Sequence, residues 1–259
     1  MGHPHRYNNS RSETQGTMTP LALYREGRLR EAIKALGDEL RSNPLDAKRR
    51  TFLFELLLFA GEFDRAEKQL DLLAGANAEA AAGTMLYRSA LHAERTRQSM
   101  FANHETPIHK EGPIHDGVWN GKPFSELSDA DPRIGANLEV FLAGSYTWIP
   151  IHYLRKLEIQ PPVNLRDLVW AQARLETSSD FRLQDIGEVL LPVLCPLFFR
   201  HADETVQLGR ETAWEPDETH GQIPYGVKTM DVDGTDVPLL EIRSVKWNAP
   251  EKESQDASA

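Results

Sequence analysis

An internal repeat with a period of 34 residues constrains the fold of this chain more than any other feature of the sequence. Five positions match at this offset: Leu23 with Leu57, Gly27 with Gly61, Leu29 with Phe63, Ala32 with Ala66, and Leu36 with Leu70. Thirty-four residues is the period of the tetratricopeptide repeat, whose unit is a pair of helices. We expect the matched glycines at turns between helices and the matched alanines where two helices approach closely. The repeat therefore predicts two tetratricopeptide-like helical hairpins.

Apolar periodicity extends this prediction to five helices. They are expected over residues 19–26, 28–42, 46–60, 62–74 and 78–101. The fifth helix would cap the stack, because two repeats are fewer than the three that a stable stack usually needs. Two repeats also leave an apolar face that a second domain would cover. The alternative is an ordinary helical bundle whose period is accidental.

The character of the sequence changes after residue 101. Residues 102–131 contain six prolines and glycines, which predicts a connector without regular structure. Residues 132–248 then resemble a series of short strands. We therefore expect an α+β chain of two domains, with tetratricopeptide-like helical hairpins over 18–101 and a mostly antiparallel, β-rich α+β domain over 132–248. The polar ends, 1–17 and 249–259, are predicted to be disordered tails.

The clearest strand prediction is a β-hairpin of residues 138–142 and 146–150 around a turn at Gly144. Further strands are expected over 155–160, 170–177, 186–194, 205–209, 225–232 and 238–247, with one helical turn over 165–168. A turn is predicted at Asp233-Gly234. All five tryptophans follow residue 118, and we expect three of them to be mostly buried in the second domain: Trp148, Trp170 and Trp247.

Two glutamates, Glu139 and Glu241, stand between apolar neighbours in predicted strands. Strand alternation favours a solvent-facing carboxylate at both positions. The alternative is an ion pair inside the fold with an arginine such as Arg174 or Arg243.

Composition excludes several classes of function. The chain has 39 acidic and 29 basic side chains, and its net charge of −10 disfavours binding to nucleic acids and anionic membranes. The longest apolar stretch, residues 52–60, is interrupted by Glu55 and is too short to cross a bilayer. No apolar secretory signal is visible, so we expect a cytoplasmic protein without membrane insertion.

The single cysteine, Cys195, excludes an intrachain disulfide and a cysteine-based zinc site, and its apolar setting predicts a buried, inert thiol.

The sequence lacks the common motifs of catalysis. It contains neither a phosphate-binding glycine loop nor the HExxH and GxSxG motifs of hydrolases. The one candidate is a metal site in the connector, made of His104, His109 and His115 with Glu111 and Asp116. The histidine spacings of 5 and 6 residues match no ligand pair on a helix. We therefore expect no catalytic residue, metal or cofactor, and a metal-dependent hydrolase using this cluster is the alternative function.

Seven stretches of the C-terminal half, in one order, resemble a known family. They are SDAD (128–131), LEVF (138–141), YTWIP (146–150), PPVNLRDLVW (161–170), GEVLLPVL (187–194), LGRETAW (208–214) and LLEIRSV (239–245). With the helical repeat they cover about residues 19–247, and the chain resembles the ImpE/SciE-type proteins, also called TagJ, of bacterial type VI secretion clusters. Two residues depart from the pattern, because Gln172 replaces an expected proline and Cys195 an expected tyrosine.

The resemblance implies an accessory protein of the contractile secretion sheath, with no established enzymatic activity. It also implies a tetratricopeptide-like helical domain joined to an α+β domain. Some members of the family bind the N-terminal helix of the small sheath subunit, which would link this chain to the ATPase that recycles the sheath. The expected function is thus a non-enzymatic protein-interaction adaptor that binds this helix and modulates sheath assembly or recycling.

A tetratricopeptide stack binds partners on its concave side, which the first helix of each hairpin lines. The residues predicted to line this groove are Leu21, Tyr24, Arg25, Lys48, Thr51, Glu55, Leu58, Phe59, Met85, Ser89 and His92. The apolar members could contact an amphipathic helix, and the charged members could fix its orientation. The alternative is that the C-terminal domain or the fifth helix fills the groove, so that its apolar residues become internal core.

Overall fold

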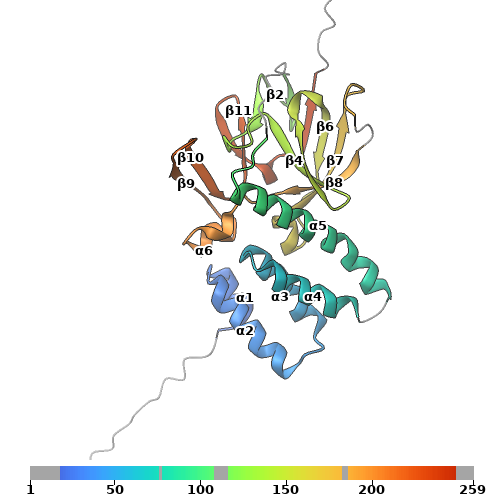
Figure 1. Ribbon diagram of the computed structural model, residues 1–259, viewed down its shortest axis with the longest axis vertical. Coiled ribbons are helices and arrows are strands. Elements are labelled where there is room, and N and C mark those ends of the chain that lie inside the picture. Colours follow the sequence, from blue (N-terminus) through green and yellow to red (C-terminus); the bar gives the residue numbers. More distant parts are fainter. Residues whose placement is uncertain (1–17, 76–77, 108–115, 183–185, 249–259) are drawn as a thin grey trace, which may run out of the picture.

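Five helices precede a set of antiparallel strands in the computed structural model, which describes residues 18–75, 78–107, 116–182 and 186–248 (Figure 1). The helices are α1 (Pro20–Arg25), α2 (Leu29–Ser42), α3 (Ala47–Phe59), α4 (Phe63–Ala74) and α5 (Ala78–Ala102). Every helix bound lies within one residue of its predicted position. The α+β fold class is therefore confirmed. Both predicted disordered tails, 1–17 and 249–259, lie outside the described residues.

Gly27 and Gly61 form the same turn after the first helix of each hairpin. Both have a left-handed φ, +82° and +67°. The N–H of Gly27 donates to the carbonyl of Tyr24 (3.0 Å), and the N–H of Arg28 donates to the carbonyl of Leu23 (2.9 Å). The same two bonds recur 34 residues later, at 3.1 and 3.0 Å. This is the Schellman ending of a helix, which favours glycine, so the prediction of equivalent glycine turns is confirmed.

Alanine at these two glycines should separate backbone strain from packing. Gly27→Ala should cost about 1–2 kcal/mol, because an L-residue is strained in the left-handed conformation. The nearest side-chain atom to its new Cβ, Nη1 of Arg210, is 3.6 Å away. Gly61→Ala should cost about 1–3 kcal/mol more, because its Cβ would lie 2.3 Å from Cγ of Phe199. Urea denaturation measures both losses, and equal losses would show that Phe199 moves aside freely.

An eight-stranded sheet makes up most of the C-terminal half, in the order β2-β1-β13-β6-β7-β8-β4-β5. Its strands are β1 (Gly117–Trp119), β2 (Lys122–Phe124), β4 (Asn137–Leu142), β5 (Ser145–Pro150), β6 (Leu154–Ile159), β7 (Trp170–Thr177), β8 (Gly187–Pro192) and β13 (Ser244–Trp247). Neighbouring strands in it are antiparallel. The predicted hairpin is present as β4 and β5, and the predicted helical turn is the 3₁₀ segment η2 (Leu165–Leu168).

Two smaller antiparallel sheets complete the C-terminal half. One contains β3 (Leu127–Asp129), β11 (Thr229–Val232) and β12 (Thr235–Pro238), and Asp233-Gly234 makes the predicted turn between the last two. The other is the hairpin of β9 (Thr212–Asp217) and β10 (Gly221–Gly226). This hairpin projects from the side of the sheet, next to the short helix α6 (Glu204–Gln207) (Figure 1).

The structure corrects the sequence prediction at five places. Part of the predicted connector, residues 117–129, contains β1, β2 and β3, which are too short to show alternation in the sequence. The strand predicted over 205–209 is instead α6 and its following turn, because Asp203 caps a helix there by accepting from the N–H of Thr205 (2.7 Å). The strand predicted over 238–247 begins with a 3₁₀ turn, Leu239–Glu241. The single strand predicted over 225–232 is instead the end of β10 (221–226) and the whole of β11 (229–232), with residues 227–228 between them. The strand β9 was not predicted.

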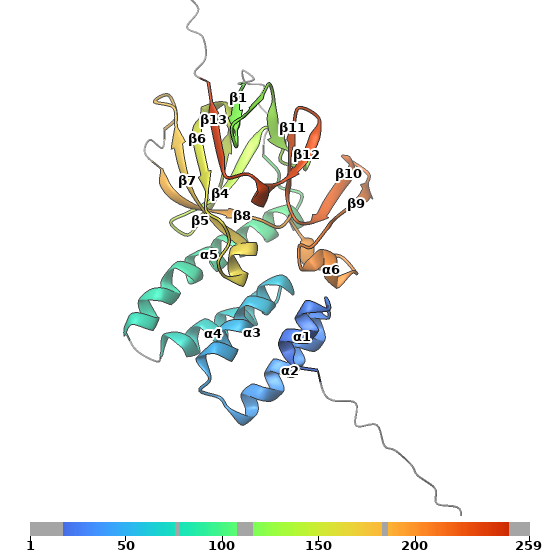
Figure 2. The same cartoon turned by 180° about the vertical axis from the view of Figure 1, so that it is seen from behind.

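The eight-stranded sheet separates two apolar cores. Along β4, Leu138 and Val140 point into the core shared with the three-stranded sheet, whereas Phe141 packs with the helices. Helix α5 lies across this second face, and the other four helices lie beyond it (Figures 1 and 2). The core on this side joins Leu91 of α5 to Trp170 of β7. Helices and sheet therefore share one continuous core.

The three tryptophans expected in the core differ in burial. Trp170 and Trp247 are 2% and 5% exposed, so they are buried as predicted. Trp148 is only half-buried, because it lies on the outermost strand, β5.

Candidate functional site

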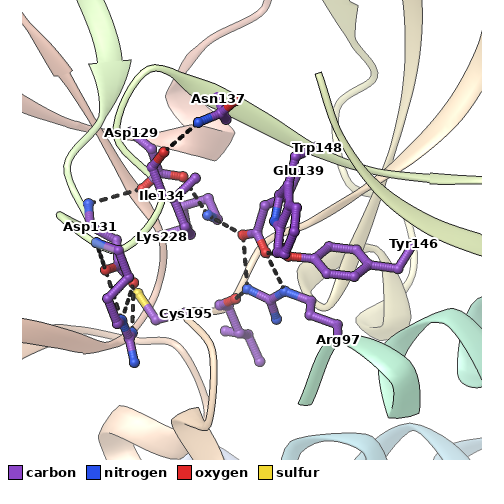
Figure 3. A network of polar contacts seen from close by, with 12 residues as sticks. Arg97, Asp129, Asp131, Ile134, Asn137, Glu139, Tyr146, Trp148, Cys195 and Lys228 are labelled. Atoms are coloured by element: carbon purple, nitrogen blue, oxygen red, sulfur yellow. Dashed lines mark hydrogen bonds and ion pairs between the residues drawn. The ribbon is translucent and has the colours of Figure 1, made fainter. Parts of the chain in front are cut away.

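A network of charged side chains lies buried where α5 meets the sheet (Figure 3). Arg97 of α5 has no exposed surface and donates two hydrogen bonds to Glu139 of β4, from Nε to Oε1 (2.7 Å) and from Nη2 to Oε2 (3.0 Å). Its Nη2 also donates to the carbonyl of Leu194 (2.9 Å). The expectation that Glu139 faces solvent is therefore wrong. Strand alternation points it toward the helices, and its partner is neither arginine considered from the sequence.

Lys228, just before β11, extends the network to β3. Its Nζ donates to Oε2 of Glu139 and to Oδ2 of Asp129, both at 2.5 Å. The hydroxyl of Tyr146 on β5 donates to Oε1 of Glu139 (2.5 Å) and accepts the indole N–H of Trp148 (2.5 Å). Glu139 is thus the acceptor for two buried cations and a phenol, and this fixes α5, β4, β5 and the start of β11 relative to one another (Figure 3).

The opposite charges set the protonation states in this network. Burial works to raise the pKa of Glu139, but Arg97 and Lys228 outweigh it and lower the pKa to about 2. Burial raises the pKa of Asp129 to about 6, against the opposing effect of Lys228. Burial works to lower the pKa of Lys228, yet its two carboxylate partners hold it above its ordinary value. Glu139, Asp129 and Lys228 are therefore charged at pH 7, and their ion pairs hold the surrounding strands together inside the fold.

A second arm of the network starts at Glu94, one turn before Arg97. Its Oε1 accepts from Nη1 of Arg97 (3.2 Å) and Nε2 of Gln98 (2.5 Å), and its Oε2 accepts from the indole N–H of Trp170 (2.9 Å). Gln98 in turn accepts from the backbone N–H of Leu197 (2.7 Å). One face of α5 is thus fastened both to β7 and to the segment after β8.

Two arginines of the C-terminal half cover the concave side of the helical hairpins. Arg166 of η2 donates to Glu55 of α3 (2.9 Å), and its Cζ lies 4.7 Å from the ring centroid of Tyr87. Arg210, after α6, donates to the backbone carbonyl of Tyr24, and its Cζ lies 5.1 Å from the centroid of that ring. The C-terminal half therefore contacts the last turn of α1 and the face of α3 that carries Glu55.

The predicted groove residues are accordingly not brought together in one open groove. Leu58 and Phe59 have no exposed surface, and Glu55 is held by Arg166, so the groove prediction is wrong at these three positions. The other predicted residues keep some exposure, on three helices: Leu21, Tyr24 and Arg25 on α1, Lys48 and Thr51 on α3, and Met85, Ser89 and His92 on α5. For Leu58 and Phe59 of α3, the structure matches the alternative in which the apolar groove residues become internal core.

A cleft of about 430 Å³ lies between α5 and the sheet. Its apolar lining includes Leu86 of α5 and the pair Phe141 and Leu190, which face each other on β4 and β8. Its polar lining consists of Ser89, Gln160, Gln172 and Glu188. The turn between β4 and β5 approaches α5 so closely that a Cβ on Gly144 would lie 3.4 Å from Cβ of Ser89. The cleft combines apolar walls with a few polar groups, as ligand and peptide sites do.

Apolar surface continues from this cleft along α5. Met85 is 68% exposed and Leu86 50% exposed. Of the residues predicted for the groove, Ser89 lines the cleft, and Met85 is the exposed neighbour of the lining residue Leu86. Sequence reasoning missed Gln160 and Glu188, because Gln160 directly follows β6 and Glu188 lies on β8, and only the pairing of both strands with β7 brings these segments close together.

Outside the cleft, the described residues place the single cysteine and two members of the predicted connector cluster. Cys195 is buried, and burial raises the pKa of its thiol, as expected for an inert cysteine. Within the described ranges, no group of three or more His, Cys, Asp or Glu side chains is placed to hold a metal ion. Of the predicted connector cluster, His104 and Asp116 are exposed, and the other three members lie outside the described residues. No helix in the described part of the chain has the length and apolar character needed to cross a membrane.

Comparisons with known proteins identify the family. The profile of the ImpE family (ImpE protein) matches residues 121–246. The type VI secretion system accessory component TagJ of Pseudomonas aeruginosa PAO1 is 31% identical over 272 residues, spanning 91% of this chain and 94% of the relative. The chain belongs to the ImpE/TagJ family. The crystal structure of protein VPA1032 from Vibrio parahaemolyticus shares the fold, with a TM-score of 0.78 and 22% identity over 88% of this chain and 97% of that protein.

The motifs that carry the ImpE/TagJ resemblance coincide with contacts between helices and sheet. Glu139 lies in LEVF, Arg166 and Trp170 in PPVNLRDLVW, and Arg210 in LGRETAW. Each of these four side chains bonds to a residue of α1, α3 or α5. In this family member, the motifs therefore describe how the two halves of the molecule are held together.

Proposed function

We propose that this ImpE/TagJ-family protein is a non-enzymatic accessory component of a type VI secretion system and acts in the cytoplasm as a protein-interaction adaptor. Its Pseudomonas aeruginosa relative is named as such an accessory component. The observation that carries the adaptor role is the cleft between α5 and the sheet, which is open and half apolar. The buried network beneath α5 supports this role, because it keeps the two walls of the cleft in a fixed relation.

The proposed partner is the N-terminal helix of the small sheath subunit, bound in this cleft. An amphipathic helix presents apolar side chains at positions i, i+3, i+4 and i+7. Such a face suits the apolar surface made by Met85, Leu86 and Phe141. Gln172 and Glu188, on the neighbouring sheet strands β7 and β8, can bond to polar groups of the helix and set its register. Through this contact the protein would modulate sheath assembly or recycling by the sheath ATPase.

Leu86→Glu should weaken binding of a peptide with this sheath-subunit helix at least tenfold. The substitution places a charge at an apolar wall of the cleft, and tenfold corresponds to about 1.4 kcal/mol. The fold should survive, because the Leu86 side chain is half exposed. Isothermal titration calorimetry with the peptide and the full-length protein measures the loss.

Leu45→Glu is the matched control, since Leu45 is 91% exposed and lies between α2 and α3, outside the cleft lining. This variant should bind the peptide like the wild type. Unchanged affinity of a folded Leu86→Glu variant would exclude the cleft as the binding site. Equal loss in both variants would show only a general effect of added negative charge.

A further inference from the structure

A row of basic side chains follows one face of α2. Arg30, Lys34 and Arg41 are separated by four and seven residues, and Gly37 lies between them. At 3.6 residues per turn these four positions fall within an arc of about 60° and extend over about 16 Å of helix. A groove of about 390 Å³ runs between this face and α4, where Arg65 adds a fourth cation.

The groove is basic on a protein that is strongly acidic. Its lining carries four cations and a single carboxylate, that of Glu62, whereas the whole chain has a net charge of −10. Three of the cations have partly exposed ion-pair partners, with 26–50% of the acidic side chain accessible: Arg30 with Glu204, Arg41 with Asp38, and Arg65 with Glu62. Exposed pairs of this kind are worth about 0–1 kcal/mol. A partner's carboxylates can therefore replace them at little cost.

Lys34 and Gly37 make the centre of the groove accessible. Lys34 is exposed and forms no ion pair within the described ranges, and its neighbour Glu31 pairs with Arg28. A Cβ placed on Gly37 would meet no atom within 4 Å, so the backbone of α2 is open to close approach there. Beside it, Ile33 is 5% exposed and gives the groove an apolar base.

We propose that this groove between α2 and α4 binds an acidic helix of a partner protein. It is a second docking surface, independent of the cleft proposed for the sheath-subunit helix. Carboxylates spaced four and seven residues apart on one face of a helix would match the cations at the same spacing on α2. A nucleic acid fits less well, because Asp38 and Glu62 interrupt the row and would repel a continuous line of phosphates.

The probe is a labelled 20-residue helical peptide rich in alanine and glutamine, with glutamates at positions 5, 9 and 16 on one face and no lysine or arginine. A peptide of identical composition with its glutamates spread around the helix is the spacing control. The double variant Lys34→Glu/Arg41→Glu tests the groove, and Lys122→Glu/Lys246→Glu makes the same change in net charge on β2 and β13. Fluorescence anisotropy at low and physiological salt reports binding to the full-length protein.

The proposal expects that the matched peptide binds the wild type, and that the α2 variant loses at least tenfold affinity while the sheet variant loses less than threefold. Both variants should still bind the sheath-subunit helix. This control shows whether the groove on α2 acts independently of the cleft between α5 and the sheet. Equal losses in the two variants, or equal binding of the two peptides, would overturn the proposal in favour of general charge attraction. Tighter binding of a 20-nucleotide single strand, lost in the α2 variant, would instead make the groove a phosphate site.

Discussion

Glutamine in place of Glu139 should lower the free energy of unfolding by about 3–5 kcal/mol at pH 7, the range for removing one partner of a buried ion pair. Arg97 would keep Glu94 and Lys228 would keep Asp129, but each cation would lose its second carboxylate inside the fold. Because the amide has nearly the same shape as the carboxylate, the loss in unfolding free energy measures the effect of removing the charge, not of changing the side-chain volume. Urea-induced unfolding followed by tryptophan fluorescence measures it.

The loss should also depend on pH, with a sign that follows from the pKa of Glu139. In the folded state this pKa is lowered to about 2, whereas an unfolded glutamate titrates near about 4.3. The stability from the ionised carboxylate is therefore complete above about pH 5 and is lost as the pH falls toward 2. Wild type and variant should converge in stability on acidification. A difference that stays constant between pH 7 and pH 3 would contradict the ion-pair explanation.

Glu158→Gln on β6 is the matched control for this prediction. It makes the same chemical change in a strand of the same sheet, but the Glu158 side chain is 41% exposed and pairs with Lys156 at the surface. Such surface pairs contribute about 0–1 kcal/mol. If Glu139→Gln were no more destabilising than Glu158→Gln, the buried network would not stabilise the fold.

The helical half was predictable because its signals are local. The apolar spacing of each helix, the proline before α3 and the paired glycines Gly27 and Gly61 all act within one or two turns of chain. Their hydrogen bonds repeat at the offset that the sequence shows. The hairpin of β4 and β5 was predictable for the same reason, since a single short turn sets its register.

The sheet edges were not predictable, because they depend on pairing across long stretches of chain. The three-residue strand β1 exists because Val118 pairs with Lys246, far along the sequence. Without this partner, the sequence around β1 shows only the glycines and the proline of residues 117–123, which indicate a loop. Helix α6 was mistaken for a strand because Val206 and Leu208 alternate with polar residues over a segment too short to distinguish the two periods.

The site was predicted less well than the fold, because it is made by the contact between the two halves. The sequence alone predicts Glu139 at the surface, and only the fold shows that Arg97 of α5 lies opposite it. The repeat pattern likewise predicts Leu58 and Phe59 in an open groove, and only the fold shows that both are buried inside the molecule. The repeat alone correctly indicated that two units leave an uncovered apolar face, but it carried no information on which residues cover it.

Alanine in place of Trp170 should lower the free energy of unfolding by about 3–5 kcal/mol, the range for emptying a large aromatic site in a core. Trp170 is 2% exposed and packs in the core that helices and sheet share. Its indole N–H is also the donor that holds one oxygen of Glu94. The change therefore removes packing and a hydrogen bond to a buried charge together. Thermal and urea denaturation of the full-length protein measure the sum.

Phenylalanine at Trp170 and at Trp247 separates these two contributions. Both tryptophans are buried, and both substitutions remove the same indole volume. The Trp247 N–H has no hydrogen-bond partner among the described residues, whereas the Trp170 N–H donates to a carboxylate. Trp170→Phe should therefore cost about 1.5–3 kcal/mol more than Trp247→Phe, the worth of a hydrogen bond to a charged group. Equal losses would show that Glu94 is adequately held by Arg97 and Gln98 alone, and that Trp170 joins sheet to helix through packing.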